Sequence, residues 1–204
     1  MRIKDYVHCI DFPCVDARKE SYLIPDIDID PESIKVMLIS ETSASKLMDN
    51  YYFSSDALFA RTTLQAFQEA GVRLSSTQDL LRMGIYLTPA VKCGKNNYVV
   101  TNRTIVNCSV LLEGEIGLFP KVKAYLLMGD AAIKALNTVA KHQGEPRVIP
   151  AGSTYKIRGG EFTYRGNRVF PSYLQAGPSY GIEKSKQRMI AEDIAKALEV
   201  AGIA

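Results

Sequence analysis

The chain of 204 residues has a mass of 22.6 kDa, a formal net charge of +3, 47% hydrophobic and 23% charged residues. These values are typical of a globular protein with a sizeable core and exclude a disordered or collagenous chain. No apolar run approaches the ~20 residues that span a bilayer, and the N-terminus lacks the apolar core of a signal peptide, so we expect a cytoplasmic protein without a membrane segment.

Apolar runs and helical patterns alternate along the chain. Short, nearly continuous apolar runs, typical of strands buried on both faces of a parallel sheet, occupy residues 35–40, 84–91 and 121–128. Apolar side chains recur at helical spacing in residues 55–70, 103–118, 130–139 and 182–201. Two further short strands are predicted near residues 154–158 and 162–170. Alternating strands and helices predict a single domain over 1–204, a three-layer α/β/α sandwich around a short, mainly parallel sheet.

The functional site of such a fold is expected where the strands end. Ligands of parallel α/β sheets bind at the carboxyl ends of the strands. The segments that follow the predicted strands are residues 40–44, 88–93, 128–130 and the loop after 170.

Four cysteines occur as two local pairs. Cys9 and Cys14 lie near the N-terminus, and Cys93 and Cys108 lie in the middle of the chain. Close spacing lowers the entropy of assembling ligands, so the pairs are suited to an all-cysteine metal or cluster site. Spacing alone does not separate zinc from an iron–sulfur cluster, and four scattered buried thiols are the alternative.

Several stretches, in order along most of the chain, match a known pattern. They are Val91-Lys-Cys93, Cys108 in a predicted helix, the Pro-Lys-strand-Gly segment of residues 120–136, Arg158-Gly159 and Val169-Phe-Pro-Ser-Tyr173. This set resembles the iron–sulfur uracil-DNA glycosylases, families 4 and 5 of that superfamily. The resemblance implies that Cys9, Cys14, Cys93 and Cys108 hold a 4Fe–4S cluster, and that damaged or single-stranded DNA is the partner of a monomeric protein. It also implies that a base is flipped into a pocket at the sheet edge.

The sequence departs from the family's catalytic motifs. Only Glu41 remains of the first motif, and Pro89 stands where the family has an Asn that reads uracil. Gly177-Pro-Ser179 takes the place of a His-Pro-Ser motif, so the histidine is missing. By resemblance we expect Phe53, Pro89 and Ser179 to border the base, with Phe53 stacking on it.

Glu41 is the expected catalytic residue because a carboxylate can position the water that attacks the glycosidic bond. The alternative is that the Glu41 carboxylate only binds backbone amides in the loop after the first strand. Gln175 or Tyr173 is a candidate donor to the leaving base.

Basic residues are concentrated toward the C-terminus. Residues 1–50 carry 6 basic and 10 acidic groups, and residues 151–204 carry 8 and 5. Arg158, Arg165 and Arg168 are expected to contact DNA phosphates beside the strand-end pocket.

Three functions remain open from the sequence. The first is a DNA glycosylase of base-excision repair, with altered motifs and weak or absent activity on uracil. The second is a non-catalytic member of the same fold that binds a nucleic acid or nucleotide. The third is an iron–sulfur redox protein, which exposed cysteines of low pKa would favour.

Overall fold

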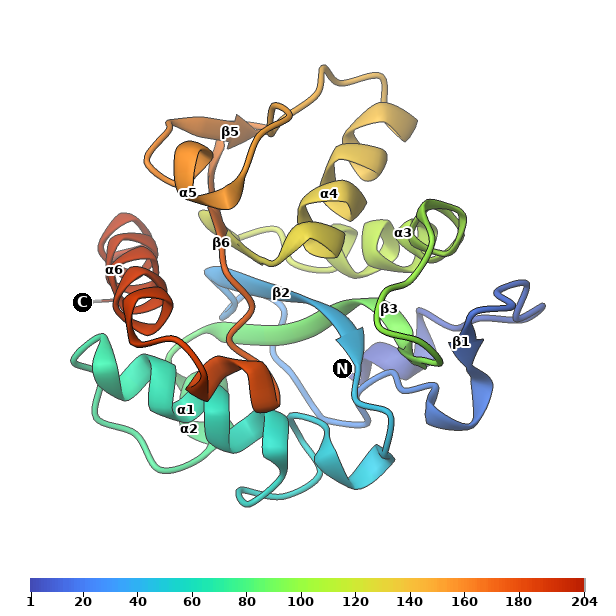
Figure 1. The fold of residues 1–204 in the computed structure, drawn as a ribbon, viewed down its shortest axis with the longest axis horizontal. Coiled ribbons are helices and arrows are strands. Elements are labelled where there is room, and N and C mark those ends of the chain that lie inside the picture. Colours follow the sequence, from blue (N-terminus) through green and yellow to red (C-terminus); the bar gives the residue numbers. More distant parts are fainter. Residues whose placement is uncertain (204) are drawn as a thin grey trace.

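The computed structural model describes residues 1–203, and its six strands form one sheet in the order β1-β3-β2-β4-β6-β5 (Figure 1). The four inner strands are parallel to one another: β2 (Val36–Ser43), β3 (Ile85–Lys95), β4 (Ala124–Met128) and β6 (Asn167–Ser172). The edge strands β1 (Ala17–Arg18) and β5 (Phe162–Tyr164) pair antiparallel with β3 and β6.

Helices cover both faces of the sheet (Figure 1). On one face lie α1 (Leu58–Glu69), α2 (Thr77–Arg82) and α6 (Lys184–Ala201), and on the other lie α3 (Asn102–Gly117) and α4 (Asp130–His142). The buried apolar side chains accordingly form two clusters, one on each face of the sheet. This confirms the predicted three-layer α/β/α fold. The short helical segments are η1 (Ile3–Asp5), η2 (Lys19–Ser21), η3 (Leu47–Asp49), α5 (Thr154–Ile157) and η4 (Pro178–Gly181).

The inner strands and long helices form where the sequence predicts them. Every side chain of β4 is buried, as is every side chain of β2 except Glu41, which explains their continuous apolar runs. Helix α1 ends before Gly71, whose φ of +89° suits the position after a helix C-cap. The six-residue helix α2, not predicted, has a capping box in which Ser76 and Asp79 exchange hydrogen bonds.

Two of the predicted strands are wrong. Residues 154–157 form the helical turn α5, in which the amides of Lys156 and Ile157 bond the carbonyl of Ser153. The single strand expected near 162–170 is a hairpin of two strands, because Arg165 and Gly166 both have positive φ, 51° and 80°. Two consecutive residues of positive φ make the tight turn that joins antiparallel strands.

Within residues 1–203, every helix is too short or too polar to cross a membrane.

Candidate functional site

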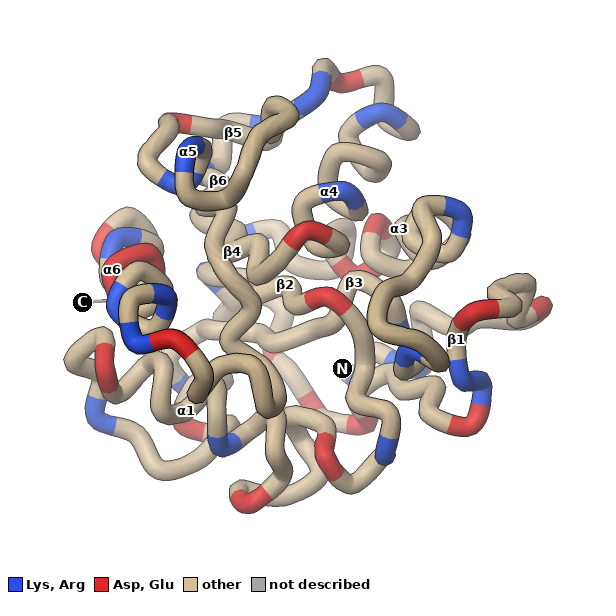
Figure 2. The backbone as a smooth tube through the Cα atoms, viewed as in Figure 1, with Lys and Arg blue, Asp and Glu red and all other residues tan. Residues whose placement is uncertain are grey.

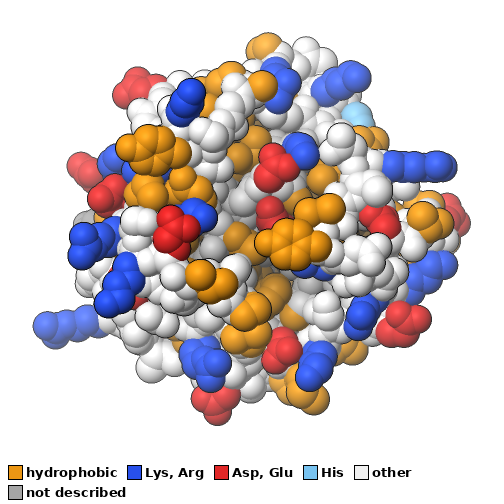
Figure 3. All heavy atoms as spheres, viewed as in Figure 1, with side chains coloured by type: hydrophobic (Ala, Val, Ile, Leu, Met, Phe, Trp, Pro, Cys, Tyr) orange, Lys and Arg blue, Asp and Glu red, His pale blue; other side chains and the backbone are white. Residues whose placement is uncertain are grey.

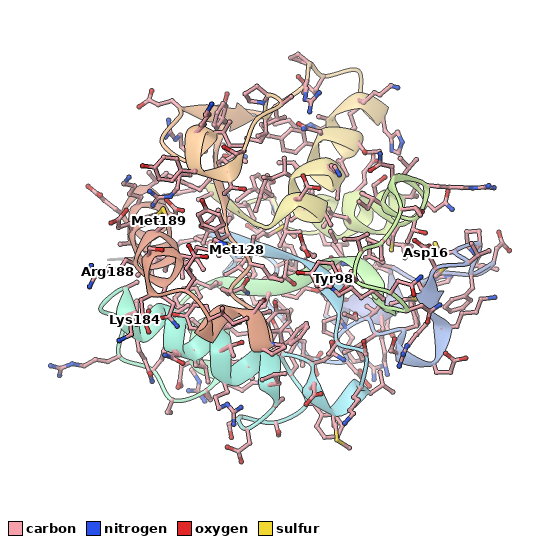
Figure 4. The ribbon with its side chains drawn as sticks, viewed as in Figure 1. Asp16, Tyr98, Met128, Lys184, Arg188 and Met189 are labelled. Atoms are coloured by element: carbon pink, nitrogen blue, oxygen red, sulfur yellow. The ribbon has the colours of Figure 1, made fainter. Side chains whose placement is uncertain are left out.

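The carboxyl ends of the parallel strands β2, β4 and β6 meet at one edge of the sheet. Figure 3 shows a shallow hollow near the centre of the face turned to the viewer, with acidic, basic and hydrophobic side chains around it. In the same view, Figure 4 places Met128, the last residue of β4, and Tyr98, from the loop after β3, at this centre. The hollow therefore lies where parallel α/β sheets bind their ligands.

Glu41, in β2, is held at the N-terminus of α4. Its Oε1 accepts a hydrogen bond from the amide of Ala131 at 3.4 Å. The carboxylate packs on Gly129, where an added Cβ would come within 2.6 Å of Oε1 and where φ is +103°. Glycine is therefore required there for the close approach, and the helix dipole stabilises the negative charge. The bonded amide belongs to the first turn of α4, after β4, and not to the loop after β2 that the alternative interpretation named; because the side chain stays half-exposed, positioning of water stays a prediction.

The three expected base contacts differ in exposure. Phe53 is 64% exposed and Ser179 is also exposed, so both side chains are open to a ligand. Pro89 is buried within β3, opposite Ser40 of β2, and its carbonyl accepts a hydrogen bond from Lys92 Nζ at 2.6 Å. Contact between Pro89 and a base stays a prediction, and the burial of Pro89 argues against it.

Gln175 is fully buried on the α1 side of the sheet. Its Nε2 donates to the hydroxyls of Tyr51 (3.1 Å) and Thr63 (3.2 Å), and burial raises the pKa of Tyr51 to about 12. Among residues 1–203, Gln175 Oε1 and Ser40 Oγ are buried without a hydrogen-bond partner. Buried polar atoms of this kind are usually satisfied by an internal water. Gln175 thus belongs to a buried polar cluster, which makes it a poor donor to a departing base.

The four cysteines line one small cavity, together with the rings of Phe12 and Tyr22. They come from three segments: the N-terminal residues 7–22, the end of β3 and α3. Two hydrogen bonds join the N-terminal segment to the end of β3. The amide of Leu23 donates to Lys92 O (2.8 Å), and the amide of Gly94 donates to Ser21 Oγ (2.7 Å). The structure thus brings together the two pairs that the sequence analysis singled out.

The chemistry of these thiols fits a bound metal centre. Burial raises the pKa of Cys93 to about 12 and that of Cys108 to about 11, and nearby cysteine sulfurs contribute to both shifts. The amide of Lys92 donates to Cys108 Sγ at 3.2 Å, the kind of bond that orients a thiolate ligand. All four side chains are free thiols, and a positive centre would stabilise the thiolates that burial disfavours.

A fully buried ion pair lies beside the cysteine cavity. Lys92 Nζ is 2.6 Å from Glu115 Oε2, and both side chains are 0% exposed. The ammonium also donates to Thr88 Oγ1 (2.7 Å), while Glu115 accepts from Thr88 (2.8 Å) and Tyr86 (3.1 Å). The pair joins β3 to α3, the elements that carry Cys93 and Cys108. Sequence reasoning missed this network; the charged residue within the apolar run of β3 was the available signal.

Of the expected DNA-binding arginines, Arg165 and Arg168 lie away from the hollow, whereas Arg158 is linked to the carboxyl end of β6 through Asp193, which also accepts from Ser172 Oγ at 2.6 Å. The Arg158 guanidinium is bound internally, to Asp193 (2.8 Å), Glu192 (2.9 Å) and the carbonyl of Met189. Arg168 pairs with Ala124, the first residue of β4, so it lies at the amino end of β6. Arg165 lies in the hairpin turn beyond it. The expectation that the basic hairpin borders the carboxyl edge is wrong, because the direction of β6 sends it to the opposite edge.

Two tyrosines near the hollow each have a lysine ammonium above the ring. Tyr98 is 89% exposed, and Lys95 Nζ lies 5.4 Å from its ring centroid. Lys186 Nζ lies 5.4 Å from the ring of Tyr173. The bonded carboxylate of Glu183 raises the pKa of Lys186, and the phenols of Tyr173 and Tyr98 contribute to this shift. Tyr98 was not singled out from the sequence, where it stands in a polar loop.

No protein-family model matches the chain. Comparison with curated proteins finds the type-5 uracil-DNA glycosylase of Thermus thermophilus, which is 27% identical over 125 residues. The alignment covers 61% of this chain and 54% of that protein, so the chain spans about half the length of its relative.

Proposed function

The chain is a divergent member of the uracil-DNA glycosylase superfamily, and from that premise we propose that it hydrolyses the N-glycosidic bond of a damaged base in DNA. The observation that carries the proposal is the half-exposed carboxylate of Glu41, held at the N-terminus of α4 on the carboxyl edge of the sheet. The exposed ring of Phe53 supplies a surface on which a flipped base can stack.

In the proposed reaction the oxygen of a water molecule bonds to C1′ of the sugar. The bond from C1′ to the base nitrogen breaks, and its electron pair leaves with the base. Glu41 orients the attacking water and stabilises positive charge on the sugar, and the proton released by the water goes to solvent. The departing base then takes a proton from solvent, which balances the hydrolysis.

We expect uracil itself to be a poor substrate. Asn offers a donor and an acceptor to a base edge, whereas the proline side chain at position 89 offers neither. Gly177 replaces the histidine expected to stabilise the leaving base, and the loss of one such donor typically lowers the rate about 10²–10³-fold. A base that departs more easily, such as hypoxanthine or xanthine, suits the remaining site better.

We propose in addition that Cys9, Cys14, Cys93 and Cys108 hold a 4Fe–4S cluster. A tetrahedral zinc site needs sulfurs about 3.8 Å apart, since each Zn–S bond is about 2.3 Å. All four cysteines line one cavity. This convergence supports a cluster, in which each thiolate binds a different iron. When bound, the cluster would join the N-terminal segment, β3 and α3 as a structural link.

The cluster is tested on anaerobically purified protein. We expect brown protein with broad visible absorption and four irons and four sulfides per chain. Replacement of any one of the four cysteines by Ser should lower iron content and thermal stability together. Colourless protein with one zinc per chain would refute the cluster.

The activity is tested in single-turnover assays with oligonucleotides that carry uracil, hypoxanthine or xanthine, both single- and double-stranded. We expect slow release of hypoxanthine or xanthine, with Glu41→Gln and Phe53→Ala each lowering the rate at least tenfold. Glu32→Gln, at an exposed carboxylate paired with Lys121, is the matched control and should leave the rate unchanged. Rapid uracil release, or indifference to both site variants, would contradict the assigned site.

A second function, binding without catalysis, has one observation in its favour. Glu41 already bonds a backbone amide, and the base-reading Asn is replaced by a buried proline. Tight binding to an abasic-site analogue without release of any base would establish this function. The third function, an iron–sulfur redox protein, lacks the exposed cysteines of low pKa that would favour it, because Cys93 and Cys108 are buried and their pKa values are raised rather than lowered.

A further inference from the structure

A groove lies between the outer faces of α3 and α4, away from the cysteine cavity. It has a volume of about 600 Å³ and is bordered by the loop that follows α4. Its basic lining residues are Lys134, Lys141 and Arg147, against the single acidic residue Glu145. The groove is therefore cationic by two charges.

The basic residues lie along one side of α4. Asp130, Lys134 and Lys141 are separated by four and seven residues, which places them on one helical stripe. Figure 2 shows basic positions recurring along α4 and again on the loop beyond it. From Lys134 to Lys141 the basic part of the stripe runs about 10 Å, at 1.5 Å per residue.

One end of this stripe reaches the carboxyl edge. Lys134 Nζ bonds Asp130 at 2.6 Å, and Asp130 directly follows Gly129, on which the carboxylate of Glu41 is seated. The groove thus begins within one helical turn of the proposed catalytic carboxylate. The far wall is fixed, because Asn137 Oδ1 accepts the amides of Val148 (3.1 Å) and Ile149 (2.9 Å).

Two of its three basic side chains, Lys141 and Arg147, are available to a ligand, whereas Lys134 is paired with Asp130. Within residues 1–203, Lys141 forms no ion pair, and Arg147 uses only its Nε, which donates to the carbonyl of Ile149 at 2.8 Å. The floor adds the apolar side chains of Ile105 and Val106, the latter 45% exposed. A ligand that fits this lining is an extended polyanion with apolar parts between its charges.

We propose that this groove holds the phosphate backbone of the DNA strand that leads away from the flipped nucleotide, on one side of that nucleotide only. The proposal rests on the proposed function, because it extends the same site. A length of about 10 Å accommodates roughly three nucleotides at the ~3.4 Å rise of a stacked strand. The groove replaces the β5–β6 hairpin as the phosphate-binding surface.

The test compares single-stranded oligonucleotides in a fluorescence anisotropy assay. The core probe carries a tetrahydrofuran abasic-site analogue with two nucleotides on each side. Two longer probes extend it by eight nucleotides, one on the 5′ side and one on the 3′ side. We expect extension on one side alone to tighten binding at least tenfold, with the gain complete after about three added nucleotides.

The combined variant Lys141→Gln/Arg147→Gln should remove this gain and leave binding of the core probe within twofold of wild type. It should also reduce the salt dependence, d log K/d log[salt], by about 1.4, since each single-strand phosphate contact contributes about 0.7. Lys121→Gln/Arg165→Gln neutralises two basic residues away from the groove and is the matched control, which should keep the gain. Glu145→Gln, inside the groove, should strengthen the gain.

The outcomes separate the groove from the proposed function. Equal gains on both sides, or a gain that survives the combined variant, would overturn the groove as the strand path. Loss of preference for the abasic analogue, with a one-sided gain that still depends on Lys141 and Arg147, would refute the glycosylase site and keep the groove. If the combined variant abolishes binding of an acidic, Phe-containing peptide and leaves the DNA gain intact, the groove serves a protein partner and the proposal is wrong.

Discussion

Replacement of Lys92 by Met tests how the buried ion pair supports the cysteine cavity. Methionine is close to lysine in length but removes the ammonium and its bonds to Glu115 Oε2 (2.6 Å), Thr88 Oγ1 (2.7 Å) and Pro89 O (2.6 Å). Glu115 would keep its hydroxyl donors but lose its counter-ion in a site with no solvent contact. Removing one partner of a buried pair costs about 3–5 kcal/mol. At roughly 2–4 °C per kcal/mol for a chain of this size, Tm should fall by about 6–20 °C.

The double variant Lys92→Met/Glu115→Leu distinguishes the pair from simple loss of packing. It removes both charges, so it avoids the unpaired carboxylate, but it leaves the hydroxyls of Tyr86 and Thr88 without their acceptor at about 1–3 kcal/mol each. We therefore expect the double variant to lose less stability than the two single variants added together, by at least about 2 kcal/mol.

The assay is urea unfolding followed by circular dichroism, with iron content measured on the same samples. Lys121→Met removes a lysine from the exposed pair with Glu32, 3.8 Å apart, and should change stability by less than about 1 kcal/mol. A loss below about 1 kcal/mol in Lys92→Met, or simple additivity in the double variant, would refute the reasoning.

Three further predictions concern single side chains. Hydrogen bonds from the backbone and hydroxyl of Ser75 lower the pKa of Asp79 to about 2. The contribution of the Asp79 carboxylate to folding stability is therefore full above about pH 4 and is lost as the pH falls toward 2. The Tm difference between wild type and Asp79→Asn should shrink over that range, and a constant difference would contradict this cause. Tyr98→Ala should weaken DNA binding by about 1–3 kcal/mol, the range for one stacked base, in a filter-binding assay while Tm is unchanged; unchanged affinity would remove Tyr98 from the DNA surface. Gly129→Ala should destabilise the protein more than Gly71→Ala in thermal unfolding, because both have positive φ but only the first adds a clash with the carboxylate above it; equal losses would show that the contact is relaxed.

Much of the fold follows from patterns that are local in sequence. The buried strands β2 and β4 are continuous apolar runs, and α4 begins at a Gly-Asp pair directly after a strand. Polar and apolar side chains alternate in Thr154-Tyr-Lys-Ile157, a pattern that predicts a strand. In the structure these four residues, shortly before Gly159-Gly160, form only a helical turn. The prediction of one strand of nine residues over 162–170 is wrong because it leaves out the turn at Arg165-Gly166.

The site was harder to predict because its parts come from distant segments. The two cysteine pairs were visible as pairs, and the structure adds the segment 7–22 that brings them to one cavity. Lys92 and Glu115 are separated by 23 residues, and although the position of Lys92 beside an apolar run is a signal of burial, no sequence pattern identifies Glu115 as its partner. Arg165 and Arg168 are recognisable from the sequence as a basic pair. Their distance from the hollow depends on the direction of β6, which their charge does not determine.

The order in which the chain is synthesised bears on how the cysteine cavity forms. Cys9 and Cys14 leave the ribosome first, and Cys108 is made 94 residues after Cys14. At about 5–20 residues per second, that interval lasts roughly 5–20 s. For most of it the first two thiols are exposed to oxidants, because the bonds that fasten the N-terminal segment form only after Lys92 and Gly94 have been made. Closure of the cavity is therefore a late event of folding, and conditions that slow translation should lengthen the period in which the N-terminal thiols can be oxidised.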